Sequence, residues 1–381
     1  LLTLELLNRW KIAPRDRGAG EPPYQTAEVR ERCVFTTHTP IEAAQDRYPY
    51  ELFDRLLPEF VEPRVLRALA GEDALNMTRL ALSLSGWVNG VSRRHAATTA
   101  QMYPGHRVRA ITNGVHVGTW AHPAFARLFQ ARFPQWEHEP EILARAGQLD
   151  DEDVWRCHAA AKRELIGRVK ALTGIAFDAD RPIIGFARRM TGYKRPLLLF
   201  SDLDRLAAIA ARRPFQIVLA GKAHPRDDSG KEAIARLHEL LRALPAELRA
   251  AFLPNHDLEL AKTLVAGADV WLNTPLPPLE ASGTSGMKAA LNGVLNLGVL
   301  DGWWVEACED GVNGWAIGID GDGPQDHAAA LYEKLEASVL PLYHGDRAGW
   351  RRMMKEAIRS IASYFNSQRM MRRYASEVYL R

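Results

Sequence analysis

Residues 269–304 read DVWLNTPLPPLEASGTSGMKAALNGVLNLGVLDGWW, and this stretch decides the fold class. The run 269–272 is a short apolar strand candidate, and a proline-rich loop follows it. Helical spacing over 287–292 then leads into a second apolar run over 294–299. We predict that these residues form one strand–helix–strand unit of a parallel sheet.

The same alternation continues on both sides of this stretch. The other strand candidates are 182–187, 215–220, 250–253 and 315–318, and the helical stretches are 196–212, 229–244, 258–266 and 325–381. Strands that alternate with helices predict an α/β protein with a doubly wound parallel sheet. Ligands of such sheets bind beyond the carboxyl ends of the strands.

The N-terminal part of the chain has a different pattern. Residues 33–37 and 108–112 are strand candidates, and the apolar spacing over 50–102 predicts helices. A long helix is expected after the acidic pair Asp150 and Asp151, which suits a helix cap.

The composition is that of an ordinary globular protein, with 381 residues, 47% apolar, 25% charged and a net charge of +3. This balance favours neither nucleic acid nor an anionic membrane as a partner, and no apolar run is long enough to span a bilayer. The three cysteines, Cys33, Cys157 and Cys308, lie far apart without metal-ligand spacing. We therefore expect no metal site and a reducing compartment such as the cytoplasm.

The densest group of small and reactive residues runs from Glu280 to Lys288 as EASGTSGMK. Small residues at a helix start leave backbone N–H groups that can face an anion, and Thr284 and Ser285 add hydroxyl donors. Lys288 could approach the same pocket, either as a phosphate clamp or as an amine that attacks a carbonyl. The pattern also fits an ordinary loop and helix start with an exposed lysine.

A second group, RRMTGYKR over 188–195, follows the strand candidate 182–187. Its four cations suit a phosphate dianion, because arginine offers a planar fork and lysine a point charge. The alternative is a solvated basic loop, but the position after a buried strand favours ligand binding.

Two weaker signals lie earlier in the chain. His38, in FTTHTP, follows a strand candidate and could bond a hydroxyl ligand or act as an acid or base. Asn113, in ITNGVHVGTW, belongs to a turn signal, with Trp120 close behind it. Both residue types are more often structural, so neither indicates a function without other support.

Together these runs resemble the α-glucan phosphorylase family, in the bacterial branch with shorter chains. The matching runs keep the family's order and are FTTHTP (35–40), VNGVSRRH (88–95), ITNGVHVGTW (111–120), FARRMTGYKRP (186–196), AGKAHP (220–225) and the whole of 269–304. The last run is long and specific.

The resemblance implies a glycosyltransferase B fold, in which two Rossmann-like domains enclose the active site. Residues 1–117 would then be the remaining, incomplete part of the first domain, and residues 118–381 the cofactor-binding domain with a helical tail. Members of the family are much longer, and this chain opens with Leu1 rather than Met. We therefore expect a C-terminal half whose upstream part is missing and which is inactive alone.

The resemblance also implies pyridoxal 5′-phosphate held covalently by Lys288. The family's other cofactor-contacting positions are matched here by Thr284, Ser285, Gly286, Arg188 and Trp120. One position departs from the pattern, since His256 stands where a tyrosine is expected beside the cofactor. Part of the cofactor pocket is therefore in question.

For the substrates, the resemblance implies that Arg189 and Lys194 bind inorganic phosphate. The positions that hold the glucosyl unit are matched by His38, Asn113, Glu280, Ser282 and Gly283. The implied reaction is reversible, retaining phosphorolysis of terminal α-1,4 bonds of glycogen, starch or maltodextrin to α-glucose 1-phosphate. In it the cofactor phosphate relays a proton to inorganic phosphate.

Two other interpretations were weighed. A nucleotide-sugar glycosyltransferase of the same architecture, such as a glycogen synthase, would need no reactive lysine, so Lys288 disfavours it. A non-catalytic glucan-binding fragment is disfavoured because the matched positions other than His256 hold chemically competent residues. The sequence leaves the oligomeric state open, with a homodimer as the commonest arrangement.

Overall fold

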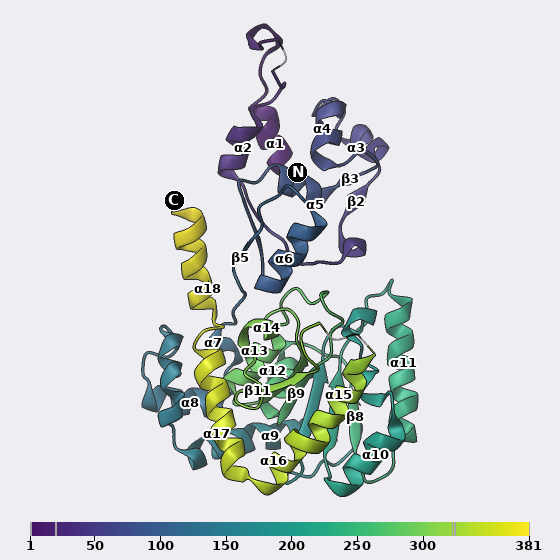
Figure 1. The fold of residues 1–381 in the computed structure, drawn as a ribbon, viewed down its shortest axis with the longest axis vertical. Coiled ribbons are helices and arrows are strands. Elements are labelled where there is room, and N and C mark those ends of the chain that lie inside the picture. Colours follow the sequence, from purple (N-terminus) through teal and green to yellow (C-terminus); the bar gives the residue numbers. More distant parts are fainter. Residues whose placement is uncertain (1, 20, 322, 324, 381) are drawn as a thin grey trace. The chain divides into compact units, whose positions relative to one another are not determined.

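The computed structural model describes residues 2–19, 21–321, 323 and 325–380 (Figure 1). The chain divides into two compact units. One contains Leu1–Thr112 together with Arg373–Arg381, and the other contains Asn113–Arg372.

The second unit is built on a parallel six-stranded sheet. Its strands are β6 (Ile183–Ala187), β7 (Gln216–Ala220), β8 (Ala250–Leu253), β9 (Val270–Asn273), β10 (Leu295–Val299) and β11 (Gly314–Ile317). The order is β11-β10-β9-β6-β7-β8, and every neighbouring pair is parallel. The predicted α/β class and parallel sheet are confirmed, and each of the six strands predicted for this sheet agrees with an observed one to within one residue at either end.

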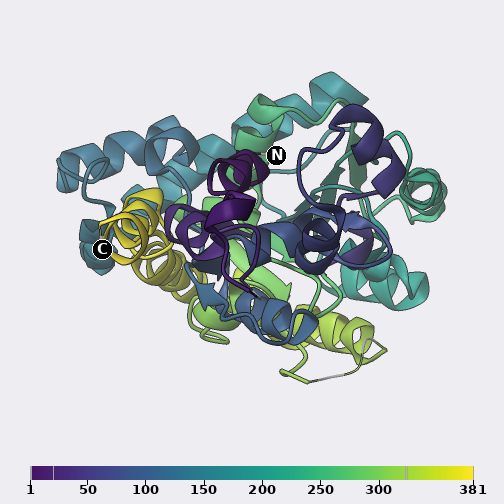
Figure 2. The ribbon, with the colours of Figure 1, turned by 90° about the horizontal axis from the view of Figure 1, so that it is seen from above.

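Side chains of the strands alternate between two apolar layers, as the pleat of a strand requires. Ile184 and Phe186 of β6 face a layer that includes residues of α10 (Leu203–Arg212) and α11 (Asp228–Ala243). Ile183 faces the opposite layer, with residues of α9 (Asp151–Thr173) and α12 (Leu258–Gly267). Seen from above, helices lie on both sides of these strands (Figure 2).

The long helix α9 begins where its sequence predicts. The Asp150 carboxylate accepts hydrogen bonds from the N–H groups of Glu152 and Asp153, and Gly174 ends the helix with a φ of 76°. The other helices of this unit are α7 (Val117–Trp120), α8 (Pro123–Arg132), α13 (Ser285–Leu291), α14 (Trp304–Ala307), α15 (Asp326–Lys334), α16 (Leu340–Gly345) and α17 (Arg347–Ala357). The C-terminal helix α18 is Ser367–Tyr374.

The first unit has a small parallel sheet in the order β1-β4-β5, formed by β1 (Val34–Thr36), β4 (Trp87–Gly90) and β5 (Arg109–Ala110). The short strands β2 (Arg47–Tyr48) and β3 (Leu75–Asn76) pair antiparallel. Its helices are α1 (Leu2–Arg9), α2 (Thr26–Arg32), α3 (Tyr50–Leu56), α4 (Pro63–Ala70), α5 (Met77–Ser83) and α6 (Arg93–Met102).

The prediction of helices throughout 50–102 is wrong at β3 and β4. Trp87–Gly90 pairs with β1, more than 50 residues earlier, and with β5. A strand of four residues shows too few alternations for a period of two to stand out, so its partners decide its structure.

Two features are absent from the described residues. No helix there combines the length and the apolar character that crossing a membrane requires. No group of three or more His, Cys, Asp or Glu side chains in the same residues is arranged to hold a metal ion.

Candidate active site

The candidate site lies where the strand order of the large sheet reverses direction. From β6 the chain moves outward to β7 and β8, and it then returns to place β9 on the other side of β6. Open α/β sheets bind ligands beyond the carboxyl ends of the strands at such a switch point. The loops that leave β6 and β9 are the two segments that carry the basic run and the EASGTSGMK run.

One carboxylate joins these two loops. Glu280, after β9, accepts from the Arg188 guanidinium at 2.8 Å and forms an ion pair with Lys194, both after β6. Glu280 and Lys194 are buried, whereas Arg189 is exposed and has no hydrogen-bond or ion-pair partner among the described residues. The structure therefore brings Arg188, Lys194 and Glu280 together beyond the carboxyl ends of β6 and β9.

The charges of this cluster do not balance. Burial and the nearby Arg188 charge lower the pKa of Lys194 to about 7, although Glu280 acts in the opposite direction. For Glu280, burial alone would raise the pKa, but the charges of Arg188 and Lys194 outweigh burial and lower it. One carboxylate thus faces more positive charge than it can neutralise, which favours binding of an additional anion.

Arg188 supplies a direct indication of such a ligand. Its Nε and Nη1 atoms are buried and have no hydrogen-bond partner among the described residues, while its Nη2 atom donates to Glu280. A buried charged donor without an acceptor is costly. An oxyanion such as phosphate would satisfy the free nitrogens of the guanidinium.

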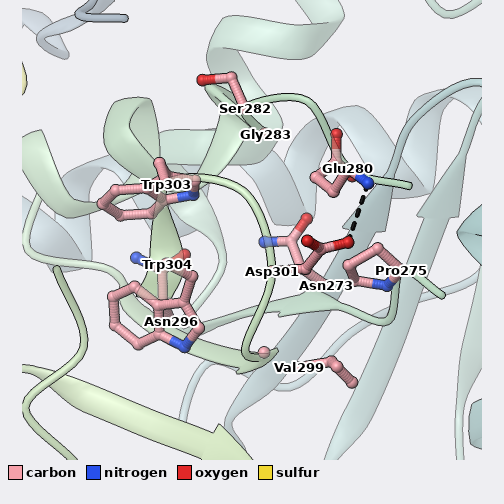
Figure 3. Close-up of a pocket in the computed structure, with 11 residues that line it drawn as sticks. Asn273, Pro275, Glu280, Ser282, Gly283, Asn296, Val299, Asp301, Trp303 and Trp304 are labelled. Carbon is pink, nitrogen blue, oxygen red and sulfur yellow. Dashed lines mark hydrogen bonds between the residues drawn. The ribbon is translucent and has the colours of Figure 1, made fainter. Parts of the chain in front are cut away.

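The segment that follows β10 binds and packs against the turn after Glu280. Asp301 accepts from the backbone N–H of Glu280 at 2.8 Å and from that of Gly302 at 2.8 Å. Gly283 has a φ of 92°, and a Cβ there would approach the Trp303 ring at 3.2 Å. Figure 3 shows this turn above Asp301, with the Trp303 ring beside it.

A small cavity of about 10 Å³ is lined by residues of this turn and of the segment after β10. Four of its lining residues place a buried polar atom without a hydrogen-bond partner among the described residues: Asn273 Oδ1, Ser282 Oγ, Asn296 Oδ1 and Trp304 Nε1. Such atoms suit hydroxyl groups or ordered water.

The segment Thr284–Gly286 begins helix α13, two residues earlier than the predicted start at Met287. The Thr284 hydroxyl has no partner among the described residues, whereas the Ser285 hydroxyl accepts from Trp271 Nε1 at 3.1 Å. At Gly286 a Cβ would lie 2.3 Å from Asn296 Oδ1, so the close packing of α13 against β10 requires glycine there.

Lys288 lies on this short helix, and its amine is 3.8 Å from the centroid of the Trp120 ring. Among the described residues it has no acidic or hydrogen-bonding partner. Burial lowers the pKa of Lys288, which favours the neutral, nucleophilic amine. His256 is within electrostatic range of this amine, and burial followed by the Lys222 charge lowers the pKa of its ring.

Two predicted residues belong to other segments of the chain. His38 is an exposed residue of the first unit, two residues after β1. Asn113 opens the second unit, and its backbone carbonyl accepts from Arg369 at 3.1 Å. No contact of the Asn113 side chain with the Glu280 cluster is present among the described residues.

These features fit pyridoxal 5′-phosphate in two ways. An amine without an acidic partner on an aromatic ring suits attachment of an aldehyde. The unpaired, buried Arg188 nitrogens suit a phosphate group. The residues that would hold the group are Lys288, Trp120, Arg188 and the Thr284–Gly286 segment.

Sequence reasoning did not single out Asp301, Trp303 or Asn296, which support the site from below. A signal existed, since all three belong to β10 or directly follow it. Because β10 lies beside β9, its carboxyl end had to reach the same edge of the sheet.

Comparisons with known proteins agree with this site. The sequence model of the carbohydrate phosphorylase family matches residues 63–315. Maltodextrin phosphorylase of Thermococcus litoralis is 40% identical over 92% of this chain and 47% of its own length. Glycogen phosphorylase of Aquifex aeolicus is 38% identical over 92% of this chain and 58% of its own length. Glycogen phosphorylase of Mycobacterium tuberculosis is 36% identical over 92% of this chain and 47% of its own length.

The chain thus spans about half the length of the curated relatives that it matches. The family match covers the basic loop, the EASGTSGMK run and the strands that carry them. The resemblance of the quoted motifs is confirmed over most of the chain, and the chain belongs to the carbohydrate phosphorylase family.

Proposed function

We propose that the complete gene product carrying this chain catalyses reversible phosphorolysis of terminal α-1,4 bonds in glycogen, starch or maltodextrin. The product is α-glucose 1-phosphate, formed with retention. The observation that carries the proposal is the cluster Arg188–Glu280–Lys194, which holds unneutralised positive charge at the switch point of the sheet. Phosphorolysis needs such charge because inorganic phosphate is the attacking group.

Pyridoxal 5′-phosphate, when bound, supplies a phosphate group that passes a proton to and from the substrate phosphate. Lys288 would hold the cofactor, and Trp120 packs against that lysine. Thr284, Ser285 and Gly286 would hold the cofactor phosphate, and Arg188 would neutralise part of its charge. His256 is a neutral neighbour of the lysine rather than an additional cation.

Arg189 and Lys194 bind the substrate phosphate in this proposal. Lys194 lies at the base of the site, fixed by Glu280, and can both carry and release a proton near neutral pH. Arg189 is exposed and free to meet an incoming dianion. Together they stabilise the negative charge of phosphate beside a glucosyl cation as the glycosidic bond breaks.

The glucosyl unit is held by Glu280, Ser282 and Gly283 in the turn after β9, with His38 and Asn113 as further contacts. The turn is rigid because Asp301 holds the Glu280 backbone. A fixed set of polar groups orients the sugar and excludes water, which would otherwise compete with phosphate.

We also propose the glycosyltransferase B arrangement, with residues 1–117 contributing to a first Rossmann-like domain and residues 118–381 forming the second. The relatives are about twice as long as the matched region, which supports a first domain completed by other residues. This chain alone is accordingly inactive. The free cysteines Cys33, Cys157 and Cys308 support a cytoplasmic location.

The proposal is tested by locating the cofactor. In the complete gene product, reduction with borohydride after incubation with pyridoxal phosphate should fix the label on Lys288, as read by peptide mass spectrometry. Lys288→Ala should remove both the label and the phosphorolysis of maltooligosaccharides. The matched control is Lys262→Ala, which removes a lysine paired with Glu259 on helix α12 and should change neither. A label fixed on another lysine would refute the assignment.

A further inference from the structure

Arg195 is the one cation of the run 188–195 to which the proposed reaction gives no role. Its backbone has φ 47° and ψ 58°, the left-handed region that residues other than glycine rarely adopt. A residue held in this conformation is constrained by its surroundings, and such constraints cluster at functional sites.

The Arg195 guanidinium spans from the β6 loop to the β9 loop. Its Nε atom donates to the Thr274 carbonyl at 2.9 Å, and its Nη2 atom donates to the Pro275 carbonyl at 2.7 Å. Nη2 also contacts the Nδ1 atom of buried His327, in α15, at 2.9 Å. A planar guanidinium can bind adjacent carbonyls in a way that a lysine amine cannot.

The β9 loop binds back to the same backbone. The buried Thr274 hydroxyl contacts the carbonyls of Lys194 at 3.0 Å and Arg195 at 3.2 Å. Two residues further on, the Leu276 N–H donates to the Tyr193 carbonyl at 2.7 Å. The backbone on either side of the Lys194 side chain is therefore tied to the first residues of the loop that leads to Glu280.

We infer that Arg195 is a positioning residue, which locks the β6 and β9 loops together so that Lys194 and Glu280 face one site. The inference rests on the proposed role of Lys194 in phosphate binding. Glu280 has a second support, since Asp301 holds its backbone. The Lys194 backbone is joined to the β9 loop through the Thr274 hydroxyl of this lock, so loosening the lock should affect phosphate more than glucan.

The test uses the complete gene product and Arg195→Ala. We expect the Kd for inorganic phosphate, measured by isothermal titration calorimetry, to rise on the order of 10- to 100-fold, because a displaced binding group loses its alignment. The KM for phosphate should rise in parallel, while the KM for maltooligosaccharide stays within about twofold of the wild type. Arg195→Lys keeps the charge without the fork and should give an intermediate effect.

Thr274→Val is a second, nearly isosteric variant. It removes the hydroxyl that contacts the Lys194 carbonyl and should weaken phosphate binding in the same selective way, by about threefold to tenfold. Arg181→Ala is the matched control, since its guanidinium also donates to a backbone carbonyl, that of Glu247, at 3.1 Å. Arg181 precedes the amino end of β6, whereas the site lies beyond the carboxyl end of this strand, so phosphate binding should not change.

Several outcomes would overturn the inference. Unchanged phosphate affinity in Arg195→Ala would do so, as would equal losses for phosphate and glucan, which indicate a merely structural residue. If Arg195→Ala unfolds at a lower temperature than Arg181→Ala, Thr274→Val and Arg195→Lys decide the question. If the wild type itself fails to bind phosphate, the proposed role of Lys194 fails first, which separates the two proposals.

Discussion

Two buried ionic clusters lie at opposite ends of strand β9, and both combine an acid with two basic side chains. At the amino end, Asp269 meets His158 and Lys162. At the carboxyl end, Glu280 meets Arg188 and Lys194. The comparison separates ionic groups that hold the fold together from ionic groups arranged for a ligand.

The Asp269 cluster is nearly saturated. The Asp269 carboxylate accepts hydrogen bonds from His158 Nε2 at 2.9 Å and from the Ile183 N–H at 2.7 Å, and it forms an ion pair with Lys162 at 2.8 Å. Burial alone would raise the pKa of Asp269, but Lys162 and His158 together lower it to about 2. Burial alone would lower the pKa of Lys162, but Asp269 and Tyr343 outweigh burial and raise this pKa.

In the Glu280 cluster the lysine behaves in the opposite way, because burial and Arg188 lower the pKa of Lys194 to about 7. Among the described residues, the buried atom without a hydrogen-bond partner in the Asp269 cluster is His158 Nδ1. In the Glu280 cluster, two buried nitrogens of the Arg188 guanidinium lack a partner in the same residues. The difference teaches that burial does not distinguish a structural pair from a functional one. The number of unsatisfied charged donors does.

The largest effect on stability should come from Asp269→Asn, which leaves Lys162 buried without its carboxylate. We expect the free energy of unfolding to fall by about 3–5 kcal/mol, as for other broken buried pairs. Denaturant unfolding of the second unit within the complete gene product measures this loss. Because the pKa of Asp269 is lowered in the folded state, this contribution is present above about pH 4 and is lost as the pH falls toward 2. A loss below 1 kcal/mol would remove the contrast between the clusters.

Glu280→Gln should reduce catalytic activity more than it reduces stability. Lys194 already releases its proton near pH 7, so of the two cations only Arg188 is left charged without its carboxylate. We expect the free energy of unfolding to fall by about 1–3 kcal/mol, less than for Asp269→Asn, because one buried donor loses its charged partner. The kcat/KM for phosphorolysis should fall about 100-fold, as when one oriented polar contact in an active site is lost. Large destabilisation with intact kinetics would place Glu280 with the structural cluster.

A smaller effect is expected in the pH dependence of phosphate binding. As the pH rises through about 7, Lys194 loses its proton, so phosphate affinity should fall by up to about tenfold in the wild type. Lys194→Arg stays charged and should lack this decline, while the titration of phosphate itself is common to both proteins. Calorimetric titrations between pH 6 and 8 compare the two. Parallel profiles would show that Lys194 does not control binding.

The smallest effect on phosphate binding should follow from Tyr343→Phe, which removes the hydroxyl that Lys162 contacts at 2.9 Å. Loss of one hydrogen bond to a charged group should cost about 1.5–3 kcal/mol of unfolding free energy, without any change in phosphate affinity. Tyr364→Phe removes a half-exposed hydroxyl as the control. Altered phosphate binding in Tyr343→Phe would mean that the two clusters are coupled through β9.

The sequence by itself determined the large sheet. Each strand from β6 to β11 is an apolar run bounded by helices, and local composition is enough to find such runs because both faces of a parallel sheet are buried. The basic run and the EASGTSGMK run were also found in sequence, since each follows one of these strands. Their motifs carried the family assignment.

Only the tertiary structure decided how these residues pair. Nothing local in the sequence indicates that Glu280 bridges Arg188 and Lys194, that Arg195 binds the carbonyls of Thr274 and Pro275, or that β4 is a strand. These contacts join segments about 50 to 90 residues apart. Their geometry depends on which strands become neighbours, and strand order is a property of the assembled sheet rather than of any one segment.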